Sequence, residues 1–203
     1  MKREPTVYVV DDDDGMRQST GVLLESANLA FEVFESATEF LHKAQPDLTG
    51  CIILDFHMPG MTGMELIVKL REKGLILPIL MVSGTGSIPV AVEGMKLGLF
   101  DFLVKPVDPD LLLAKANAAM ELDAQQRENV AALNEIRAKL ATLTPREEEL
   151  LTLIVSGLPN KNIATEMSIS VKTVENHRAN LMTKTGAANV ADLVRMKMLV
   201  TDK

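Results

Sequence analysis

Apolar residues in the first half of the chain gather into five short runs, and longer amphipathic segments separate them. Between the first two runs, apolar or small residues recur at the spacing of one helix face: Met16, Thr20, Leu23, Leu24 and Ala27. The five runs, which we predict to be strands, are 6–10, 30–34, 50–55, 78–82 and 101–104. Strands that alternate with helices indicate right-handed βαβ units and a parallel sheet.

The middle strands lack the alternation of a sheet with one wet face. The runs CIILD (51–55) and PILMV (78–82) are apolar at successive positions, as in strands that helices cover on both faces. We therefore predict an α/β fold, a doubly wound (βα)5 parallel sheet of the flavodoxin-like type. In such sheets ligands bind outside the carboxyl ends of the strands.

A long helical segment follows the last strand. Between Pro109 and Pro145 there is no proline, and residues 111–141 are rich in Ala, Leu, Glu and Gln, which favour helix. Mostly apolar residues recur there at alternating spacings of three and four, as in the a and d positions of a heptad: Ala119, Leu122, Gln126, Asn129, Leu133, Ile136 and Leu140. Two interpretations stay open, a short parallel coiled coil and a helix packed on its own domain.

The end of the chain reads as four short helices. Residues that can cap their first turns are Thr144, Asn160, Ser170 and Asn189, and Gly157 and Gly186 are natural stops. The second and third helices, joined by a short turn, form a helix-turn-helix. On the third helix Val171, Val174, Leu181 and Met182 lie toward one side. The residues that project elsewhere, available to a DNA major groove, are Lys172, Glu175, Asn176 and Ala179.

Composition supports two domains with different tasks. The chain has 203 residues, is 47% hydrophobic and carries a net charge of −7. Residues 1–140 hold 13 Lys and Arg against 21 Asp and Glu, a net −8, whereas residues 141–203 hold 8 against 7, a net +1. We predict an α/β domain over 1–123, a helical linker over 124–141 and a smaller all-α helix-turn-helix domain over 142–203.

Cellular context can also be inferred from composition. The chain has no apolar run near 18 residues, which argues against a membrane span, and its N-terminus shows no signal-peptide core. Its single cysteine, Cys51, lies in an apolar run and fits a small buried residue in a reducing cytosol. We expect a cytoplasmic protein.

Polar residues end four of the predicted strands, where they would meet at one edge of the sheet. Asp11 and Asp12 follow the first strand, Asp55 ends the third, and Ser83 and Lys105 follow the fourth and fifth. Carboxylate oxygens suit Mg²⁺, and Ser and Lys suit the oxygens of a phosphoryl group. Asp55 can itself act as the nucleophile and form an acyl phosphate. We interpret Asp11 and Asp12 as part of a cation site, with a solvated loop as the alternative, and we expect Asp13 and Asp14 to be solvated and to cap the first helix.

Four motifs at these strand ends resemble the receiver domain of two-component response regulators. They are VVDDDD, ILDFHMPGMTG, MVSGTG and FDFLVKP. The resemblance implies that Asp55 is the phosphoacceptor. It also implies that Asp12, Asp55 and the backbone carbonyl of His57 bind Mg²⁺ directly, and Asp11 mostly through water. The remaining roles fall to Ser83 and Lys105, which would hold the phosphoryl group, and to Phe102, an aromatic switch that turns inward on activation.

Two further motifs resemble the LuxR-type DNA-binding domain. TPREEELLTLIVSGLPNKNIA precedes SVKTVENHRANLMTKTG, and with the receiver they make the chain similar to the NarL/FixJ family of response regulators, closest to its FixJ branch. The resemblance implies that one set of residues holds DNA phosphates: Lys161, Thr173, His177, Arg178 and Lys184. It implies that Glu175, Asn176 and Ala179 face bases, and Lys172 is exposed beside them.

The implied partners follow from this family. They are a sensor histidine kinase, double-stranded promoter DNA and a second copy of the chain on phosphorylation, with RNA polymerase left open and no membrane. The family also implies that the fourth helix and fifth strand form the dimer surface.

Two other classes of protein are alternatives. One is an aspartyl-phosphate enzyme of the haloacid-dehalogenase type, whose D-x-D-x-[TV] strand end is missing here, and the other is a receiver whose helical tail binds only protein. We expect a transcription regulator rather than an enzyme.

Overall fold

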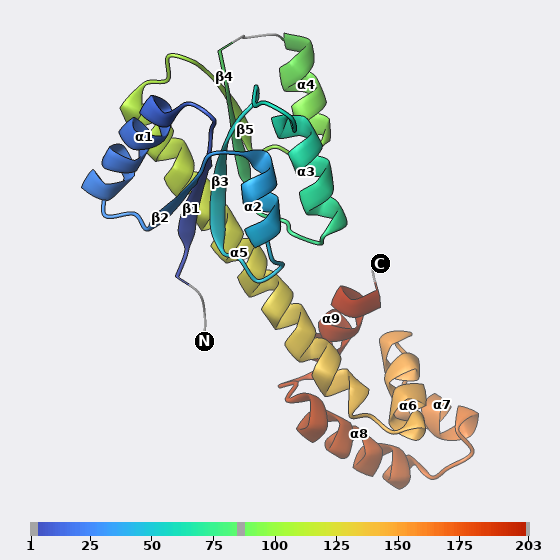
Figure 1. The fold of residues 1–203 in the computed structure, drawn as a ribbon. Coiled ribbons are helices and arrows are strands. Elements are labelled where there is room, and N and C mark those ends of the chain that lie inside the picture. The colour runs from blue at the N-terminus through green and yellow to red at the C-terminus, as the bar shows by residue number, and fades with distance from the viewer. Residues whose placement is uncertain (1–3, 85–87, 202–203) are drawn as a thin grey trace. The chain divides into compact units, whose positions relative to one another are not determined.

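The computed structural model divides the chain into two compact units, Met1–Arg127 and Glu128–Lys203 (Figure 1). It describes residues 4–84 and 88–201, with the backbone alone for 88–91. The motif MVSGTG is thus described only as far as Gly84. The strands of the first unit are β1 (Thr6–Val10), β2 (Phe31–Phe34), β3 (Gly50–Asp55), β4 (Ile79–Ser83) and β5 (Asp101–Val104). Its helices are α1 (Asp14–Ser26), α2 (Ala37–Lys43), α3 (Gly63–Glu72), α4 (Ile88–Lys96) and α5 (Pro109–Ala141), the last of which continues into the second unit.

All strand pairs are parallel, in the order β2-β1-β3-β4-β5. The chain leaves β1 toward one edge and returns to pair β3 on the other side of β1, so the order reverses between β1 and β3. That reversal is the position at which a doubly wound sheet binds ligands. The doubly wound fold predicted from the alternating runs is confirmed, and each strand begins and ends within one residue of its predicted bounds.

Successive residues of each central strand enter opposite cores. Tyr8 and Val10 of β1 pack with α2 and α3, whereas Val7 and Val9 pack with α1 and α5. Cys51 belongs to the second core, where burial and then the charge of Asp123 raise the pKa of its thiol to about 12. This agrees with the prediction of a small buried residue.

Helix α5 is one continuous helix of 33 residues, as the lack of proline predicted. At its middle Asp123, which is 3% exposed, accepts hydrogen bonds from the Gly50 amide at 2.9 Å and from Arg127 Nε at 2.8 Å. Arg127 also donates to the Leu48 carbonyl. We call Asp123, Arg127 and their two backbone partners the α5 clamp. The clamp joins α5 to the start of β3.

The apolar register of α5 is only partly buried beyond the clamp. Gln126 and Asn129 are exposed, whereas Leu140 packs against the core of the second unit. At Leu140 the structure therefore supports the second interpretation, a helix that packs on its own domain, which here is the second unit.

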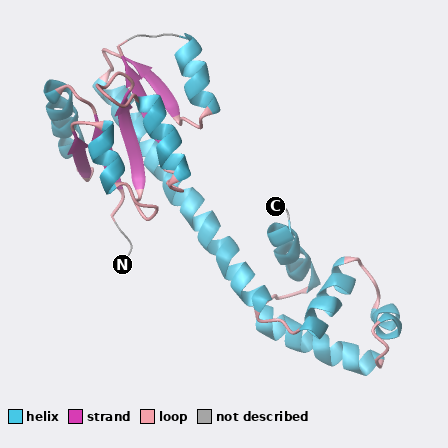
Figure 2. Ribbon diagram, turned by 45° about the vertical axis from the view of Figure 1, so that its right-hand side comes forward, coloured by secondary structure: helices cyan, strands magenta, loops and turns pink. Residues whose placement is uncertain are grey.

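Four helices follow, and the second unit contains no strand within its described residues, as the colours of Figure 2 show. They are α6 (Pro145–Val155), α7 (Asn160–Glu166), α8 (Val171–Thr185) and α9 (Val190–Thr201). Their shared core includes Leu150, Ile163, Val174 and Leu181. Val171, expected on the core side of α8, is 42% exposed, because it is the first residue of the helix and precedes the turns that pack.

The predicted caps of these helices are right in three cases of four. Thr144 forms a capping box with Glu147, and the side chains of Ser170 and Asn189 accept amides of α8 and α9. Asn160 as a cap was wrong: Pro159 precedes the first turn of α7 without a side-chain bond, and Asn160 Oδ1 accepts from Arg178 at 2.8 Å instead.

In the described part of the chain, none of the helices has the length and apolar character that a bilayer crossing requires.

Candidate functional site

The carboxyl ends of β1, β3 and β5 bring two aspartates and a lysine into contact. Lys105 Nζ lies 2.6 Å from Asp55 Oδ1 and 2.9 Å from Asp11 Oδ2. Asp55 is 5% exposed and Asp11 is 6% exposed. One ammonium group therefore balances two carboxylates that would otherwise repel each other at the end of adjacent strands.

Backbone groups fix these side chains. The His57 amide donates to Asp55 Oδ2 at 2.6 Å, and the Asp13 amide donates to Asp11 Oδ1 at 2.9 Å. Lys105 is positioned by its own amide, which donates to the Ser83 carbonyl at 2.8 Å. Ser83 ends β4 and is fully buried, and its backbone thus lies next to that of Lys105, whereas its predicted bond to a phosphoryl group stays a prediction.

The loop after β3 folds back so that α3 begins against the strand end. A β-carbon on Gly63 would lie 2.6 Å from the Asp55 carbonyl oxygen, so any larger residue would force the helix or the strand to move. Gly60 takes a φ of +81°, which favours glycine, within the turn. The close approach of Gly63 to Asp55 was not predicted from the sequence.

The charges of the site shift its titration. Burial raises the pKa of the Asp55 carboxyl, the hydrogen bond from Lys105 opposes that shift, and the charge of Asp11 adds to it. For Lys105, burial favours the neutral amine, but the hydrogen bonds and charges of Asp55 and Asp11 outweigh burial and raise its pKa. The lysine therefore stays charged at neutral pH.

The donor chemistry of this edge suits a hard cation. Asp11, Asp12 and Asp55 offer carboxylate oxygens, the ligands that Mg²⁺ prefers. Within the described residues no group of three or more such side chains is already gathered for a metal, since Asp12 is exposed and Lys105 lies between the other two. The residue types fit Mg²⁺, whereas the side-chain arrangement is that of a lysine-bridged pair.

The rest of the acidic run serves the first helix. Asp13 caps α1 by accepting the Met16 amide at 3.0 Å, and Asp14 pairs with Arg17 in the first turn, where negative charge meets the positive end of the helix dipole. Arg17 also donates to the Asp11 carbonyl at 2.7 Å. Asp13 and Asp14 are thus explained by helix capping.

Two aromatic side chains flank the pair. Phe102 on β5 is partly buried and packs against the core that contains Met81. His57 is exposed, and its ring meets Phe56 edge-on at 4.4 Å between centroids.

The second candidate surface is the exposed side of α8 with the start of α7. The predicted DNA contacts that are exposed are Lys161, Lys172, Glu175, Asn176, Ala179 and Lys184, and those that are half-buried are Thr173, His177 and Arg178. Val174 and Leu181 are buried on the opposite side of α8, as predicted. The helix therefore presents polar side chains in a row while its apolar side holds it to the core.

Two of these basic residues have partners on other helices. Lys184 Nζ lies 2.7 Å from Glu147 Oε2, a carboxylate that is 4% exposed and also caps α6. Arg178 donates to Asn160 and so joins α8 to α7. Sequence spacing showed the capping box of Glu147 but not its ion pair, since Lys184 lies 37 residues away.

Comparison with protein families places both units. Residues 7–117 match the response regulator receiver domain, and residues 141–197 match the bacterial regulatory proteins of the luxR family. The lysine-bridged aspartates lie inside the first match, and α8 lies inside the second.

Full-length relatives carry the same pair of domains. The transcriptional regulatory protein FixJ of Azorhizobium caulinodans is 43% identical over 95% of this chain and 92% of its own length. The response regulator protein TmoT of Ectopseudomonas mendocina is 38% identical over 98% and 91%. Among solved structures, the response regulator StyR is 37% identical with a TM-score of 0.85 over 97% of this chain and 99% of that one. Full-length FixJ from B. japonicum is 40% identical with a TM-score of 0.60 over 97% of each. The chain belongs to the FixJ-like two-component response regulators, transcription regulators that join a receiver domain to a LuxR-type DNA-binding domain.

Proposed function

We propose that Asp55 accepts a phosphoryl group from a sensor histidine kinase with Mg²⁺, and that phosphorylation promotes pairing of two chains and their specific binding to promoter DNA in the cytoplasm. One observation carries the first step. Asp55 ends the central strand β3 with one oxygen on the Lys105 ammonium and the other on the His57 amide, so its carboxylate is held at the ligand-binding edge of the sheet.

The chemistry is a transfer between two residues. A carboxylate oxygen of Asp55 attacks the phosphorus of a phosphohistidine on the kinase, the P–N bond breaks, and the imidazole nitrogen keeps the electron pair and takes a proton from water. The Lys105 ammonium then faces the phosphoryl oxygens, and Ser83 bonds to one of them. Mg²⁺, held by Asp12, Asp55 and the His57 carbonyl with Asp11 through water, would supply positive charge to the transferred group.

Acetyl phosphate with Mg²⁺ tests this assignment on the full chain. We expect one acid-labile phosphoryl group per wild-type chain, measured by intact-protein mass, and none on Asp55→Asn. The matched control is Asp110→Asn, an exposed aspartate at the start of α5, which should label like wild type. Full labelling of Asp55→Asn would exclude Asp55 as the acceptor, and undiminished labelling in excess chelator would exclude the metal.

The second step rests on the exposed row of α8. Glu175, Asn176 and Ala179 face solvent while Ser170 caps the helix and Val174 anchors it, which suits a helix that enters the major groove. An Asn side chain can form two hydrogen bonds with an adenine, to N6 and N7 on its major-groove edge. We propose that these three residues read bases, and that Lys161, Lys172, Thr173, His177, Arg178 and Lys184 hold the backbone.

Genome-wide mapping of bound DNA, with and without phosphodonor, would supply the target sequence. Against that sequence we expect Asn176→Ala to lose about 1–3 kcal/mol of binding free energy while its affinity for random DNA stays unchanged, as for a base contact. Asn117→Ala, an exposed asparagine on α5, is the control and should bind like wild type. Equal losses on specific and random DNA would contradict base reading by Asn176.

Pairing is proposed to use the side of the receiver formed by α4, β5 and the start of α5. Four large apolar side chains are exposed there: Val92, Met95, Val104 and Leu111, at 50%, 54%, 47% and 43%. Joining two DNA-binding units turns the second DNA contact into an intramolecular event, which can raise avidity by about 10²–10⁴.

A further inference from the structure

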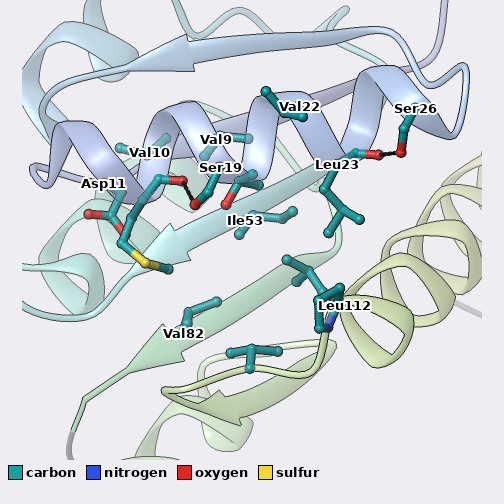
Figure 3. A pocket seen from close by; sticks show the side chains of 14 residues that line it. Val9, Val10, Asp11, Ser19, Val22, Leu23, Ser26, Ile53, Val82 and Leu112 are labelled. Carbon is teal, nitrogen blue, oxygen red and sulfur yellow. Dashed lines mark hydrogen bonds between the residues drawn. The ribbon is translucent and has the colours of Figure 1, made fainter.

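A pocket in the receiver lies between α1 and α5. It offers about 370 Å³, within the range of about 300–1,000 Å³ typical of small-molecule sites. Figure 3 shows α1 along one side, strands beneath and Leu112 of α5 on the other side. The pocket is therefore bounded by three walls of one domain.

The floor of the pocket is apolar and rigid. Val9, Ile53 and Val82 come from β1, β3 and β4, each less than 6% exposed, and they present only methyl groups. Leu23 and Leu112 form the facing walls. Strand side chains from the centre of the sheet do not move aside easily, so the space is preformed.

Two hydroxyl groups on the α1 side of the pocket already have partners. The Ser19 hydroxyl donates to the Met16 carbonyl at 3.1 Å and the Ser26 hydroxyl donates to the Leu23 carbonyl at 2.7 Å, the two bonds drawn in Figure 3. Hydroxyl groups already bonded to backbone carbonyls hold water less firmly than free ones, so an apolar molecule can displace that water at a lower cost.

Charge selects among apolar ligands. Among the described residues that line the pocket, Asp11 alone is ionisable, and its carboxylate is already paired with Lys105. An anion would be repelled by Asp11, and an organic cation would have to compete with the Lys105 ammonium that already pairs with this carboxylate. The lining therefore favours a neutral molecule.

One end of the pocket reaches the proposed phosphorylation site. Met16 and Asp11 belong to the segment that begins α1, and Val107 and Pro109 follow Lys105 in the loop before α5. A molecule in the pocket would touch both segments at once. It would brace the arrangement in which Lys105 bridges Asp11 and Asp55, which must open when a phosphoryl group arrives.

We propose that this pocket binds a small neutral apolar molecule of one or two rings, and that its occupancy slows phosphorylation of Asp55. The binding claim stands alone, whereas the second claim rests on the proposed function of Asp55.

Methyl NMR of the full chain, labelled at Ile, Leu, Val and Met, tests binding with benzene as probe and benzoate and benzylamine as charged controls. Saturable benzene shifts should appear at Ile53, Val82 and Leu112, and not at Ile52 or Leu66 in the opposite core. Neither charged ring should shift these methyls at equal concentration. Shifts spread over both cores, or none at all, would overturn the site.

Substitutions on α1 test whether benzene binds in this pocket. Ser19→Phe places a ring in the pocket and should weaken benzene binding at least tenfold, and Ser26→Leu should do so from the other end. Glu25→Phe adds the same ring at an exposed position outside the pocket and should bind benzene like wild type. Unchanged affinity in both pocket variants, with their methyl spectra showing folded protein, would refute the assignment.

The rate of Asp55 labelling by acetyl phosphate tests the coupling. Saturating benzene should slow labelling of wild type at least threefold and leave the rate of Ser19→Phe unaltered. An unchanged or faster rate on benzene-bound wild type would overturn the coupling. Absence of labelling without benzene would instead reject the proposed function, so the two failures are distinct.

Discussion

At the scale of single residues, Lys105 is the positive charge that balances two buried aspartates of the receiver, Asp11 and Asp55. Its ammonium holds two carboxylates at 2.6 Å and 2.9 Å, and no other cation is within ion-pair distance of either among the described residues. Burial by itself already raises the pKa of Asp55. The ionised state of Asp55, which the nucleophile requires, therefore depends on this lysine.

Removing that ammonium gives a measurable shift. In Lys105→Met the pKa of Asp55 should rise further, because an opposite charge is lost while the charge of Asp11 stays. A titration of ¹³C-labelled carboxyls by NMR, without divalent ions, measures it. Lys115→Met removes a lysine paired with Asp101 and should leave Asp55 unchanged. An unaltered Asp55 titration in Lys105→Met would show that the lysine does not control its ionisation.

At the scale of elements, one ion pair joins the first and third helices of the DNA-binding unit. The bond from Lys184, and next that from the Thr144 amide, lower the pKa of Glu147 to about 2. A group with a depressed pKa stabilises the fold above its unfolded value, near 4.5, and loses that contribution as pH falls toward 2. The α6–α8 contact should therefore weaken between pH 4.5 and 2.

Glu147→Gln should remove this acid sensitivity. At pH 7 we expect a loss of about 1–3 kcal/mol in the free energy of opening the unit, because Lys184 is left without its partner. Hydrogen exchange at Leu150 and Leu181, in the core between these helices, reports it. Glu149→Gln, an exposed neighbour that pairs with Arg146, is the control. The ion pair would have no structural role if both variants exchange alike at all pH values.

The α5 clamp makes a similar prediction for the first unit. Asp123→Ala leaves the buried Gly50 amide without an acceptor, at a cost of about 2 kcal/mol, so its hydrogen exchange should accelerate about 30-fold. Glu121→Ala, an exposed residue one half-turn earlier, should leave that rate unchanged. Equal exchange of Gly50 in the two variants would mean that Asp123 contributes nothing to holding β3.

Local sequence patterns predicted the helices and strands better than the contacts that join them. Strand bounds and the caps Thr144, Ser170 and Asn189 depend on neighbouring residues, so the sequence was sufficient for them. The strand-end residues Asp11, Asp55 and Lys105 could also be grouped, because the sheet rule fixes where strand ends meet.

The sequence was insufficient where a side chain bonds a distant one. Asn160 could equally cap its own helix or accept from Arg178, and only packing decides between the two. Asp123 meets the Gly50 amide across 73 residues, which no local pattern encodes. The same holds for the contact of Gly63 with Asp55, which is possible only because glycine has no β-carbon.

At the scale of the whole molecule, the switch is proposed to lie in pairing. The DNA-binding domain, residues 141–203, carries a net charge of +1. A single copy therefore releases few counterions and should bind DNA weakly at physiological salt. Affinity must then come from joining two copies rather than from charge.

Val104→Glu tests the pairing surface. A charge on β5 should keep the acetyl phosphate-treated chain monomeric in sedimentation and reduce its DNA affinity about 10²-fold or more, with Asp55 still labelled. Val68→Glu, an equally exposed valine on α3, is the matched control and should pair normally. If wild type stays monomeric when phosphorylated while its DNA affinity rises strongly, dimerisation is not the switch.

The close approach of Gly63 to the Asp55 carbonyl also has a consequence for the gene. Every glycine codon begins with two guanines, and each one-base change that alters the amino acid introduces either a stop or a residue with a β-carbon. That carbon would lie 2.6 Å from the carbonyl oxygen at the end of β3. No single-base change that replaces Gly63 therefore leaves the strand end undisturbed, so only silent changes of this codon are tolerated beside the proposed phosphoacceptor.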